Sequence, residues 1–236
     1  MIKIIMSGDT HCPHDIHKLN SKNFPEGNSL TKDDLVIICG DAGFVFDGDK
    51  EDEWWIKWIS NKPWTTIFCD GNHENFDLLN QYPIVDFFGA KAHKITDSLF
   101  HILRGEIMDY YGLTIFFFGG GVSHDVERRI EGLSWWKEEL PTQEEIDRAY
   151  NNLKKYDNHV DYIVTHDASV RFYEYFHYQL PNMLNYDQKQ QNIVWFFYDL
   201  EKQVTYKKWF HGHFHRDIEI LDHHFLYHDL IEINDD

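Results

Sequence analysis

Residues 64–74 read Trp-Thr-Thr-Ile-Phe-Cys-Asp-Gly-Asn-His-Glu, a short apolar run that ends in a polar cluster. The run is brief and rich in aromatic and β-branched residues, so it predicts a buried strand. Gly71 permits a turn, and Asn72 and His73 carry side chains that bind metals. In open α/β sheets, ligands bind at the carboxyl ends of the strands. This stretch therefore predicts a strand with a binding site at its carboxyl end.

Four other polar clusters also stand directly behind short apolar runs. They are Asp9-Thr10-His11 after residues 2–6, Gly40-Asp41 after 35–39, Thr165-His166 after 162–164, and Gly212-His213-Phe214-His215 after 209–210. Each run predicts a further buried strand. Because ligands bind at strand ends, we expect all five ends to bring two aspartates, an asparagine and several histidines together.

Length and composition predict one globular domain over residues 1–236, with cap-like insertions around 122–145 and 170–200. Hydrophobic residues make up 42% of the chain and aromatic residues 17%, which allows a large core. No apolar run reaches the roughly 20 residues that a membrane span needs. The first predicted strand begins at Ile2 and leaves no room for a signal peptide, and the 3 cysteines fit a reducing compartment. We therefore expect a cytoplasmic protein.

The formal net charge of −18, from 40 acidic and 22 basic residues, restricts the partners. A surface this acidic repels duplex nucleic acid and anionic membranes. It does not exclude phosphorylated substrates, because bound divalent cations reverse the local sign of the charge.

The rest of the chain predicts helices and a second sheet. Trp54, Trp55 and Trp58 recur at helical spacing within 51–61 and predict an amphipathic helix with these tryptophans in the core. Thr142 and Glu145 have the spacing of a capping box at the start of another helix. We also expect a loop and a polar helix in 13–34, an antiparallel meander in 92–121 that forms a second sheet, one or two helices in 170–200, and strands at 218–221 and 225–233.

The side chains of the five clusters suit a particular group of metals. Carboxylate, carboxamide and imidazole together favour Mn, Fe, Zn or Ni over Ca or Mg. Two such ions about 3.5–4 Å apart form the arrangement used for in-line displacement at phosphorus. A carboxylate must then reach both ions, and Asp41, at a strand end behind a glycine, is the natural candidate.

The five clusters and their order along the chain resemble the five motifs of the calcineurin-like metallophosphoesterase family. The matching residues are Asp9-x-His11, Gly40-Asp41, Gly71-Asn72-His73-Glu74, His166 and Gly212-His213-x-His215. The resemblance runs from residue 9 to residue 215, with every metal-ligand position filled. It implies an α/β fold, a four-layer αββα sandwich of two mixed sheets with flanking helices, and a dinuclear site at the strand ends.

The resemblance also implies a role for each motif residue. Asp9, His11 and His215 would hold one divalent ion, Asn72, His166 and His213 the other, and Asp41 would bridge them. Mn is the favoured metal, with Fe, Zn or Ni as alternatives. His73 would bind no metal and would protonate the leaving oxygen. Hydroxide bound by the two ions would attack a phosphomonoester or phosphodiester, and the substrate would be a small phosphorylated molecule or a nucleotide.

Two departures from the family pattern affect these implications. Many members carry a second aspartate three residues after the bridging one, where it orients the catalytic histidine, and here that position is Phe44. Asp47, Glu74 or a backbone carbonyl would then orient His73. The chain also lacks the arginine that follows the second motif in Ser/Thr phosphoprotein phosphatases. That activity remains an alternative, as does a non-catalytic binding scaffold with the same fold.

Residues 119–132 resemble a segment of bacterial and phage members of the family, with a Gly-Gly-x-x-Ser-x-Asp start and an arginine shortly after it. Arg129 or Arg128 would then contact the substrate phosphate, because a guanidinium binds phosphate oxygens in pairs. The alternative is that both arginines are solvated surface charges. His124 and His211 border the predicted site and are candidates for supporting contacts. The sequence does not predict the oligomeric state.

Overall fold

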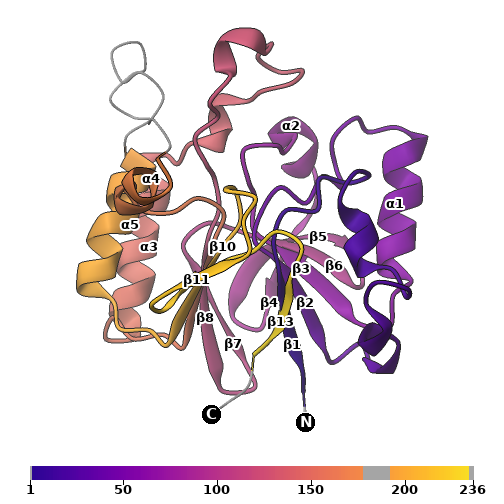
Figure 1. Cartoon of the computed structure of the whole chain (residues 1–236), viewed down its shortest axis with the longest axis horizontal. Helices are drawn as coiled ribbons and strands as arrows, with labels where there is room; N and C mark the ends of the chain where they lie inside the picture. The colour runs from indigo at the N-terminus through magenta and orange to yellow at the C-terminus, as the bar shows by residue number, and fades with distance from the viewer. Residues whose placement is uncertain (1, 178–191, 234–236) are drawn as a thin grey trace.

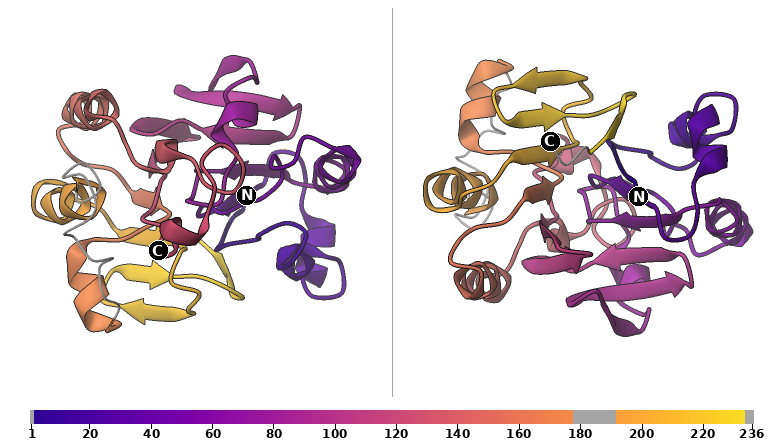
Figure 2. Two further views of the ribbon diagram at one scale, coloured as in Figure 1. Left: turned by 90° about the horizontal axis from the view of Figure 1, so that it is seen from above. Right: turned by 90° about the horizontal axis from the view of Figure 1, so that it is seen from below.

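The computed structural model describes residues 2–177 and 192–233, which form two β-sheets between two layers of helices (Figures 1 and 2). The first sheet has the strand order β13-β1-β2-β3-β6-β5-β4. Its strands are β1 (Ile4–Ser7), β2 (Leu35–Ile38), β3 (Thr65–Phe68), β4 (Ile84–Phe87), β5 (Ala90–Thr96), β6 (Leu99–Ile102) and β13 (Leu230–Glu232). The second sheet has the order β11-β12-β10-β9-β8-β7. Its strands are β7 (Glu106–Tyr110), β8 (Leu113–Phe118), β9 (Tyr162–Thr165), β10 (Lys208–His211), β11 (Ile218–Ile220) and β12 (His223–Phe225).

Successive side chains of a strand point to opposite faces of its sheet, and this alternation along the buried strands produces the four layers. In β1, Ile4 and Met6 join the core between the two sheets, and Ile5 joins the core on the outer face. Phe117 and Tyr162 come to the central core from the second sheet. The outer face of the first sheet packs under α1 (Lys50–Ser60), and that of the second packs under α3 (Gln143–Lys155), α4 (Val170–Tyr175) and α5 (Asn192–Gln203). The predicted αββα sandwich of two mixed sheets is therefore confirmed.

All five apolar runs that precede the polar clusters are strands, as predicted. They are β1, β2, β3, β9 and β10. The first three pair in parallel with one another, and β9 pairs in parallel with β10. Their carboxyl ends meet at the upper edge of the sandwich in Figure 1, where residues 119–142 cross above them. This is the edge at which the sequence predicts the site.

The predicted second sheet needs a correction. Residues 92–121 do not form one meander, because β5 and β6 pair with each other and β6 continues onto β3 in the first sheet. Only the hairpin of β7 and β8 enters the second sheet, where β8 lies parallel to β9. Likewise, 225–233 is not one strand, because β12 stays in the second sheet and β13 pairs antiparallel with β1.

The helix predictions have mixed outcomes. The helix predicted at 51–61 is α1, and Thr142 and Glu145 form the capping box of α3. Trp54 is 55% exposed, so its place in the core was wrongly predicted. Residues 13–34 contain two 3-10 helices, η1 (Ile16–Leu19) and η2 (Pro25–Ser29), in place of the expected polar helix. The described residues also contain three further short helices, α2 (Phe76–Leu79), η3 (Val126–Arg128) and η4 (Lys137–Glu139).

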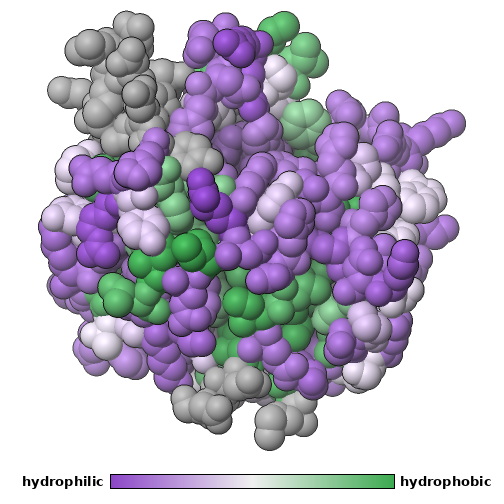
Figure 3. Space-filling model, in the orientation of Figure 1, coloured by the Kyte–Doolittle hydropathy of each residue, from purple (hydrophilic) through white to green (hydrophobic). Residues whose placement is uncertain are grey.

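The insertion predicted at 170–200 contains α4 and the first part of α5, and its residues 178–191 lie outside the described residues. Among the described residues, no helix has both the length and the apolar character to cross a membrane. Hydrophilic residues cover most of the face drawn in Figure 3, with hydrophobic residues gathered mainly in its lower half.

Candidate metal centre

The loops after the five strands hold several predicted ligands in a strained backbone conformation. His11, Asp41, His213 and His215 have φ angles of 35°, 48°, 67° and 48°. Residues other than glycine seldom adopt this left-handed region, at a cost of about 1–3 kcal/mol each, and Asp and His adopt it more often than most. The backbone therefore bends at these four positions to aim side chains that a regular loop would direct elsewhere.

The first group of ligands consists of Asp9, His11 and His215. One ligand atom from each lies within 4.8 Å of the others. His11 Nε2 and His215 Nε2 are 2.9 Å apart. The Asp9 carboxylate is fixed by the backbone N–H of His213, which lies 3.0 and 3.1 Å from its two oxygens. This is the set that the sequence predicts for one ion.

The second group consists of Asn72, His166 and His213. Asn72 Oδ1 lies 3.0 Å from both His166 Nε2 and His213 Nδ1, and these two nitrogens are 3.2 Å apart. Ligand atoms bound about 2.1 Å from one ion at about 90–100° lie about 3.0–3.2 Å apart. The three atoms thus have the mutual spacing of ligands that share one metal ion.

Asp41 lies between the two groups. Its Oδ2 is 3.3 Å from His166 Nε2 in the second group and 3.7 Å from His11 Nε2 in the first. Its Oδ1 accepts a hydrogen bond from the backbone N–H of His73 at 2.8 Å. One carboxylate oxygen therefore faces both groups, as a bridging ligand requires, and the other is held by the backbone.

Close packing of the strand ends depends on glycine at two positions. A Cβ atom on Gly71 would overlap the Asp41 carboxylate, and one on Gly40 would overlap the His166 ring. Gly40 also has a φ of 82°, which favours glycine. These two residues let the loops after β2 and β3 approach the ligands directly.

The electrostatics of the centre call for positive charge. Asp9 and Asp41 are buried, and neither carboxylate pairs with a lysine or arginine among the described residues. Burial opposes the charge of Asp41, but His166 and other nearby histidines outweigh it and hold the pKa of Asp41 well below 3.8. Burial alone would lower the pKa of His166, yet Asp41 and Asp9 raise it to about 10. Buried charges in proteins are paired or coordinate metals, so a divalent cation fits this donor set.

His73 lies beside the centre with Arg129 against its ring. Arg129 Nη1 is 3.2 Å from His73 Nδ1, and Nη2 is 3.2 Å from Nε2. Arg129 also donates through Nε to Asp125 Oδ1 at 2.7 Å. Burial lowers the pKa of His73, Asp41 partly opposes this, and Arg129 lowers it further. Arg128, in contrast, is exposed.

None of the three groups predicted to orient His73 contacts its ring among the described residues. Glu74 is buried and accepts a hydrogen bond from the backbone N–H of Ala42 at 2.8 Å. Asp47 is exposed. Phe44 is fully buried in the core beneath α1, with its ring 6.2 Å from that of Phe68. The ring of His73 is positioned by Arg129 and by the backbone bond to Asp41.

Three residues near the centre were missed in the sequence. Ser123 Oγ lies 3.0 Å from Asn72 Nδ2, and Ser123 donates to Glu139 Oε2 at 2.6 Å. Arg104 binds Asp70, directly before the third motif, and also donates to the carbonyl of Glu138 at 2.7 Å. Their sequence signal is weak, because Glu139 and Arg104 stand outside the five motifs and act across long separations.

The two bordering histidines have different surroundings. The ring of His124 stacks on that of His213, with centroids 5.7 Å apart. His211 is fully buried and lies 3.0 Å from Thr165 Oγ1 and 2.8 Å from His223. Only His124 therefore contacts a predicted ligand.

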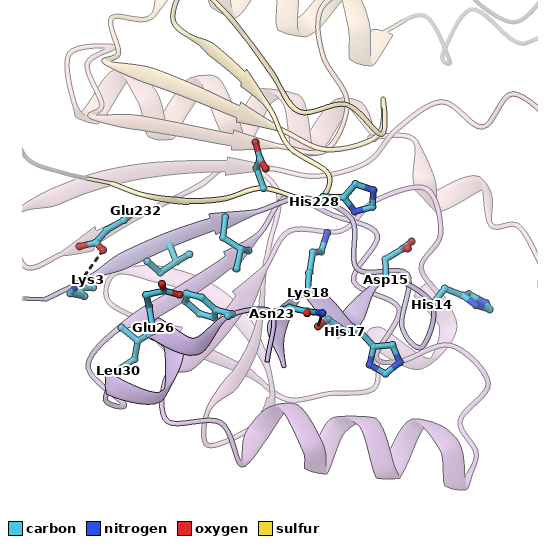
Figure 4. A pocket seen from close by; sticks show the side chains of 14 residues that line it. Lys3, His14, Asp15, His17, Lys18, Asn23, Glu26, Leu30, His228 and Glu232 are labelled. Carbon is cyan, nitrogen blue, oxygen red and sulfur yellow. Dashed lines mark hydrogen bonds and ion pairs between the residues drawn. The ribbon is translucent and has the colours of Figure 1, made fainter. Parts of the chain in front are cut away.

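Two cavities lie near the centre. One, of about 480 Å³, opens between His11 and His73 and is lined further by Trp55, Asp47 and Glu51. The other, of about 700 Å³, lies between η1, η2 and β13 (Figure 4). At its inner end Lys18 Nζ donates to the carbonyl oxygens of Gly8 and Asp9 at 2.9 and 2.7 Å. Lys18 therefore supports the residues that follow β1 from behind. No predicted metal ligand is among the described residues that line the larger cavity.

Comparison with known families agrees with this geometry. The model of the calcineurin-like phosphoesterase family matches residues 2–217. The match covers all five motifs. No curated protein sequence matches the chain.

Proposed function

Because this chain belongs to the calcineurin-like phosphoesterase family, which implies metal-dependent phosphoester hydrolysis, we propose that it cleaves a phosphomonoester or phosphodiester at a dinuclear metal centre. The main support is the convergence of seven side chains from five strand ends on one place. Asp9, His11 and His215 would hold one ion, Asn72, His166 and His213 the other, and Asp41 would bridge them. Mn²⁺ is the favoured ion, with Fe, Zn or Ni as alternatives.

When bound, such ions polarise phosphoryl oxygens and make water nucleophilic at neutral pH. The chain's own residues would supply the other parts of the reaction. His73 lies next to the bridging carboxylate, where its imidazole would give a proton to the leaving oxygen. Burial lowers the pKa of His73 in the free protein, and an anionic phosphoester beside it would favour the protonated form.

Arg129 is the better placed of the two candidate arginines. Its side chain is 15% exposed and is held by Asp125, while both terminal nitrogens face the His73 ring. A guanidinium in this position would bind two phosphoryl oxygens and orient the ester toward His73. Residues 122–145, which carry Arg129, would then act as a cap over the site within a single domain.

The cavity beside His11 and His73 is where the leaving group would lie. Its volume of about 480 Å³ suits a small molecule or a nucleoside. Trp55 supplies an aromatic wall, and Asp47 and Glu51 make the rim acidic. Such a rim repels leaving groups that carry further negative charge and favours hydroxyl-rich or cationic ones.

A substrate panel tests the proposal. p-Nitrophenyl phosphate, bis-p-nitrophenyl phosphate and a phosphopeptide would be assayed with Mn²⁺, Fe²⁺, Zn²⁺ or Ni²⁺ and after chelation. We expect metal-dependent turnover that His213→Ala abolishes and the exposed control His159→Ala retains. Full turnover by His213→Ala or by the chelated wild type would overturn the proposal. Metal binding without hydrolysis of any ester would support the scaffold alternative, and hydrolysis of phosphopeptides alone would support the phosphoprotein phosphatase.

A further inference from the structure

The carboxamide of Asn72 has two ends with different binding properties. Oδ1 carries lone pairs and faces His166 Nε2 and His213 Nδ1, each 3.0 Å away. Nδ2 carries only hydrogens and lies 3.0 Å from Ser123 Oγ. Only Oδ1 binds a cation, so a half-turn of this amide would remove one ligand from the second group.

The two imidazoles alone do not favour this orientation in the state that binds metal. His166 Nδ1 lies 2.8 Å from the carbonyl oxygen of Cys39 and donates to it. Once His166 loses its second proton, as metal binding requires, Nε2 presents a lone pair. Tyr173 donates its hydroxyl hydrogen to Asp167 at 2.8 Å, so its oxygen, 3.5 Å from His213 Nε2, accepts from that nitrogen and Nδ1 presents the other lone pair. Two lone pairs would accept hydrogen bonds from the NH₂ end of Asn72 and so favour the flipped amide.

Ser123 and Glu139 oppose this flip. Glu139 Oε2 accepts the hydroxyl hydrogen of Ser123 at 2.6 Å, and Oε1 accepts the Ser123 backbone N–H at 3.2 Å. A hydroxyl has one hydrogen, so the bond to Glu139 leaves only lone pairs facing Asn72. Both residues are 1% exposed, so water does not compete for these bonds. The hydroxyl therefore accepts from Nδ2, and Oδ1 remains directed at the histidines.

We propose that Ser123 and Glu139 are positioning residues that hold Oδ1 of Asn72 toward His166 and His213, and thereby set the affinity of the second metal group. This inference rests on the proposed dinuclear function. It assigns a role to Ser123, which lies in the segment 119–132, and to Glu139, which lies beyond it; they stand 51 and 67 positions away from Asn72. Asn72 Nδ2 donates to Ser123 Oγ, and Ser123 Oγ donates to Glu139 Oε2. The carboxylate of Glu139 therefore fixes the direction of both hydrogen bonds.

The test is a titration of the full chain with Mn²⁺. Binding is monitored through the electron paramagnetic resonance signal of the free Mn²⁺. It is run at pH 8, because burial raises the pKa of Glu139 to about 7 and the carboxylate form is needed. We expect the wild type to bind two ions. In Ser123→Ala, the affinity of one ion should fall about 10–100-fold, the usual cost of losing a contact that orients a ligand, while the other ion is little affected.

Glu139→Gln distinguishes orientation from packing, because it keeps the size of the side chain. The Ser123 backbone N–H holds the glutamine oxygen in place, so the glutamine NH₂ would donate to Ser123 Oγ. The hydroxyl hydrogen would then turn toward Asn72 and favour the flipped amide. We expect Glu139→Gln to weaken one ion at least as much as Ser123→Ala does. This variant also keeps the proposal falsifiable if Ser123→Ala does not fold.

Asn72→Asp supplies the rescue, because a carboxylate has an oxygen at both ends and cannot be misoriented. In this background Ser123→Ala should change the affinity for Mn²⁺ less than about 3-fold, since no supporting contact remains to be lost. An equal loss in both backgrounds would overturn the proposal.

The chain contains a matched control pair. Ser169 Oγ donates to Glu201 Oε1 at 2.6 Å, the same bond without a predicted ligand attached. Ser169→Ala and Glu201→Gln should therefore bind both ions as the wild type does. Wild-type affinity for both ions in Ser123→Ala and Glu139→Gln would refute the positioning role. A wild type that binds no Mn²⁺ would instead contradict the proposed function, so the two failures are distinguishable.

Discussion

Asp41→Asn should destabilise the metal-bound protein much more than the metal-free protein. Oδ2 of Asp41 faces His166 at 3.3 Å and His11 at 3.7 Å, so in the proposed centre both ions would share this oxygen. Without metal, the same carboxylate is a buried charge that only nearby histidines offset. The substitution removes the partner that offsets His166, so it should lower the stability of the metal-free protein at neutral pH, and it should lower the stability of the metal-bound protein further.

The size of the effect follows from linkage. At a free metal concentration 100 times the dissociation constant, each ion stabilises the wild type by about 2.7 kcal/mol, or about 5 kcal/mol for two. For a chain of this size that raises the melting temperature by about 10–20 °C. Losing the bridge should weaken each site at least about 100-fold. At the same metal concentration about 0.8 kcal/mol then remains, a rise of about 2–3 °C.

Thermal melts with Mn²⁺ and with chelator measure this directly. Asp147→Asn is the matched control, because it removes the same charge from an exposed position on α3. The control should keep the wild-type rise in melting temperature. The reasoning is refuted if Asp41→Asn gains as much from Mn²⁺ as the wild type, or if Mn²⁺ leaves the wild type unchanged.

Three other substitutions test neighbouring features. Phe44→Asp should not restore the family's usual arrangement; it should destabilise the protein by about 3–5 kcal/mol or more in urea unfolding, because Phe44 is fully buried in the core. Arg129→Gln should lower kcat/KM. Because Arg129 adds to the burial that lowers the pKa of His73, the substitution should also move the alkaline limb of the pH profile to higher pH. An unchanged alkaline limb would contradict this. Burial and, to a smaller extent, His101 lower the pKa of His93 to about 4. Between about pH 6.5 and 4 the unfolded chain therefore binds more protons than the folded chain, and the free energy of unfolding falls as the pH falls. His93→Gln should flatten that loss in urea melts at pH 7, 6 and 5; an unaltered pH dependence would contradict it.

The strand ends were predictable because each combines two signals within a few residues. The apolar run predicts a strand, and the polar residues that follow occupy its carboxyl end whatever the rest of the chain does. The Gly71-Asn72-His73 cluster needs only β3 in front of it to reach the correct edge. The αββα fold then followed from the resemblance to a family.

Strand pairing was not predictable in the same way, because it depends on contacts between distant residues. Residues 92–121 have the pattern of a meander, yet β6 joins β3 and β8 joins β9. Either arrangement buries the same apolar faces, so alternation alone does not decide between them. Phe44 shows the same limit at the site, since the sequence reveals that an aspartate is missing but not that the core fills its place.

The metal-free chain should fold without its ions, because the elements that bring the ligands together are stabilised elsewhere. The core between the two sheets is built from apolar side chains such as Met6, Ile37 and Phe117, none of which is a predicted ligand. The left-handed backbone at Asp41 and His213 is unfavourable at the centre itself. A centre held in this unfavourable state by a stable sandwich is already arranged for cations, so binding need not order the ligands first. Melting with chelator should therefore remain cooperative, and a chelated chain that lacks a cooperative transition would show that the ions, and not the two sheets, assemble the site.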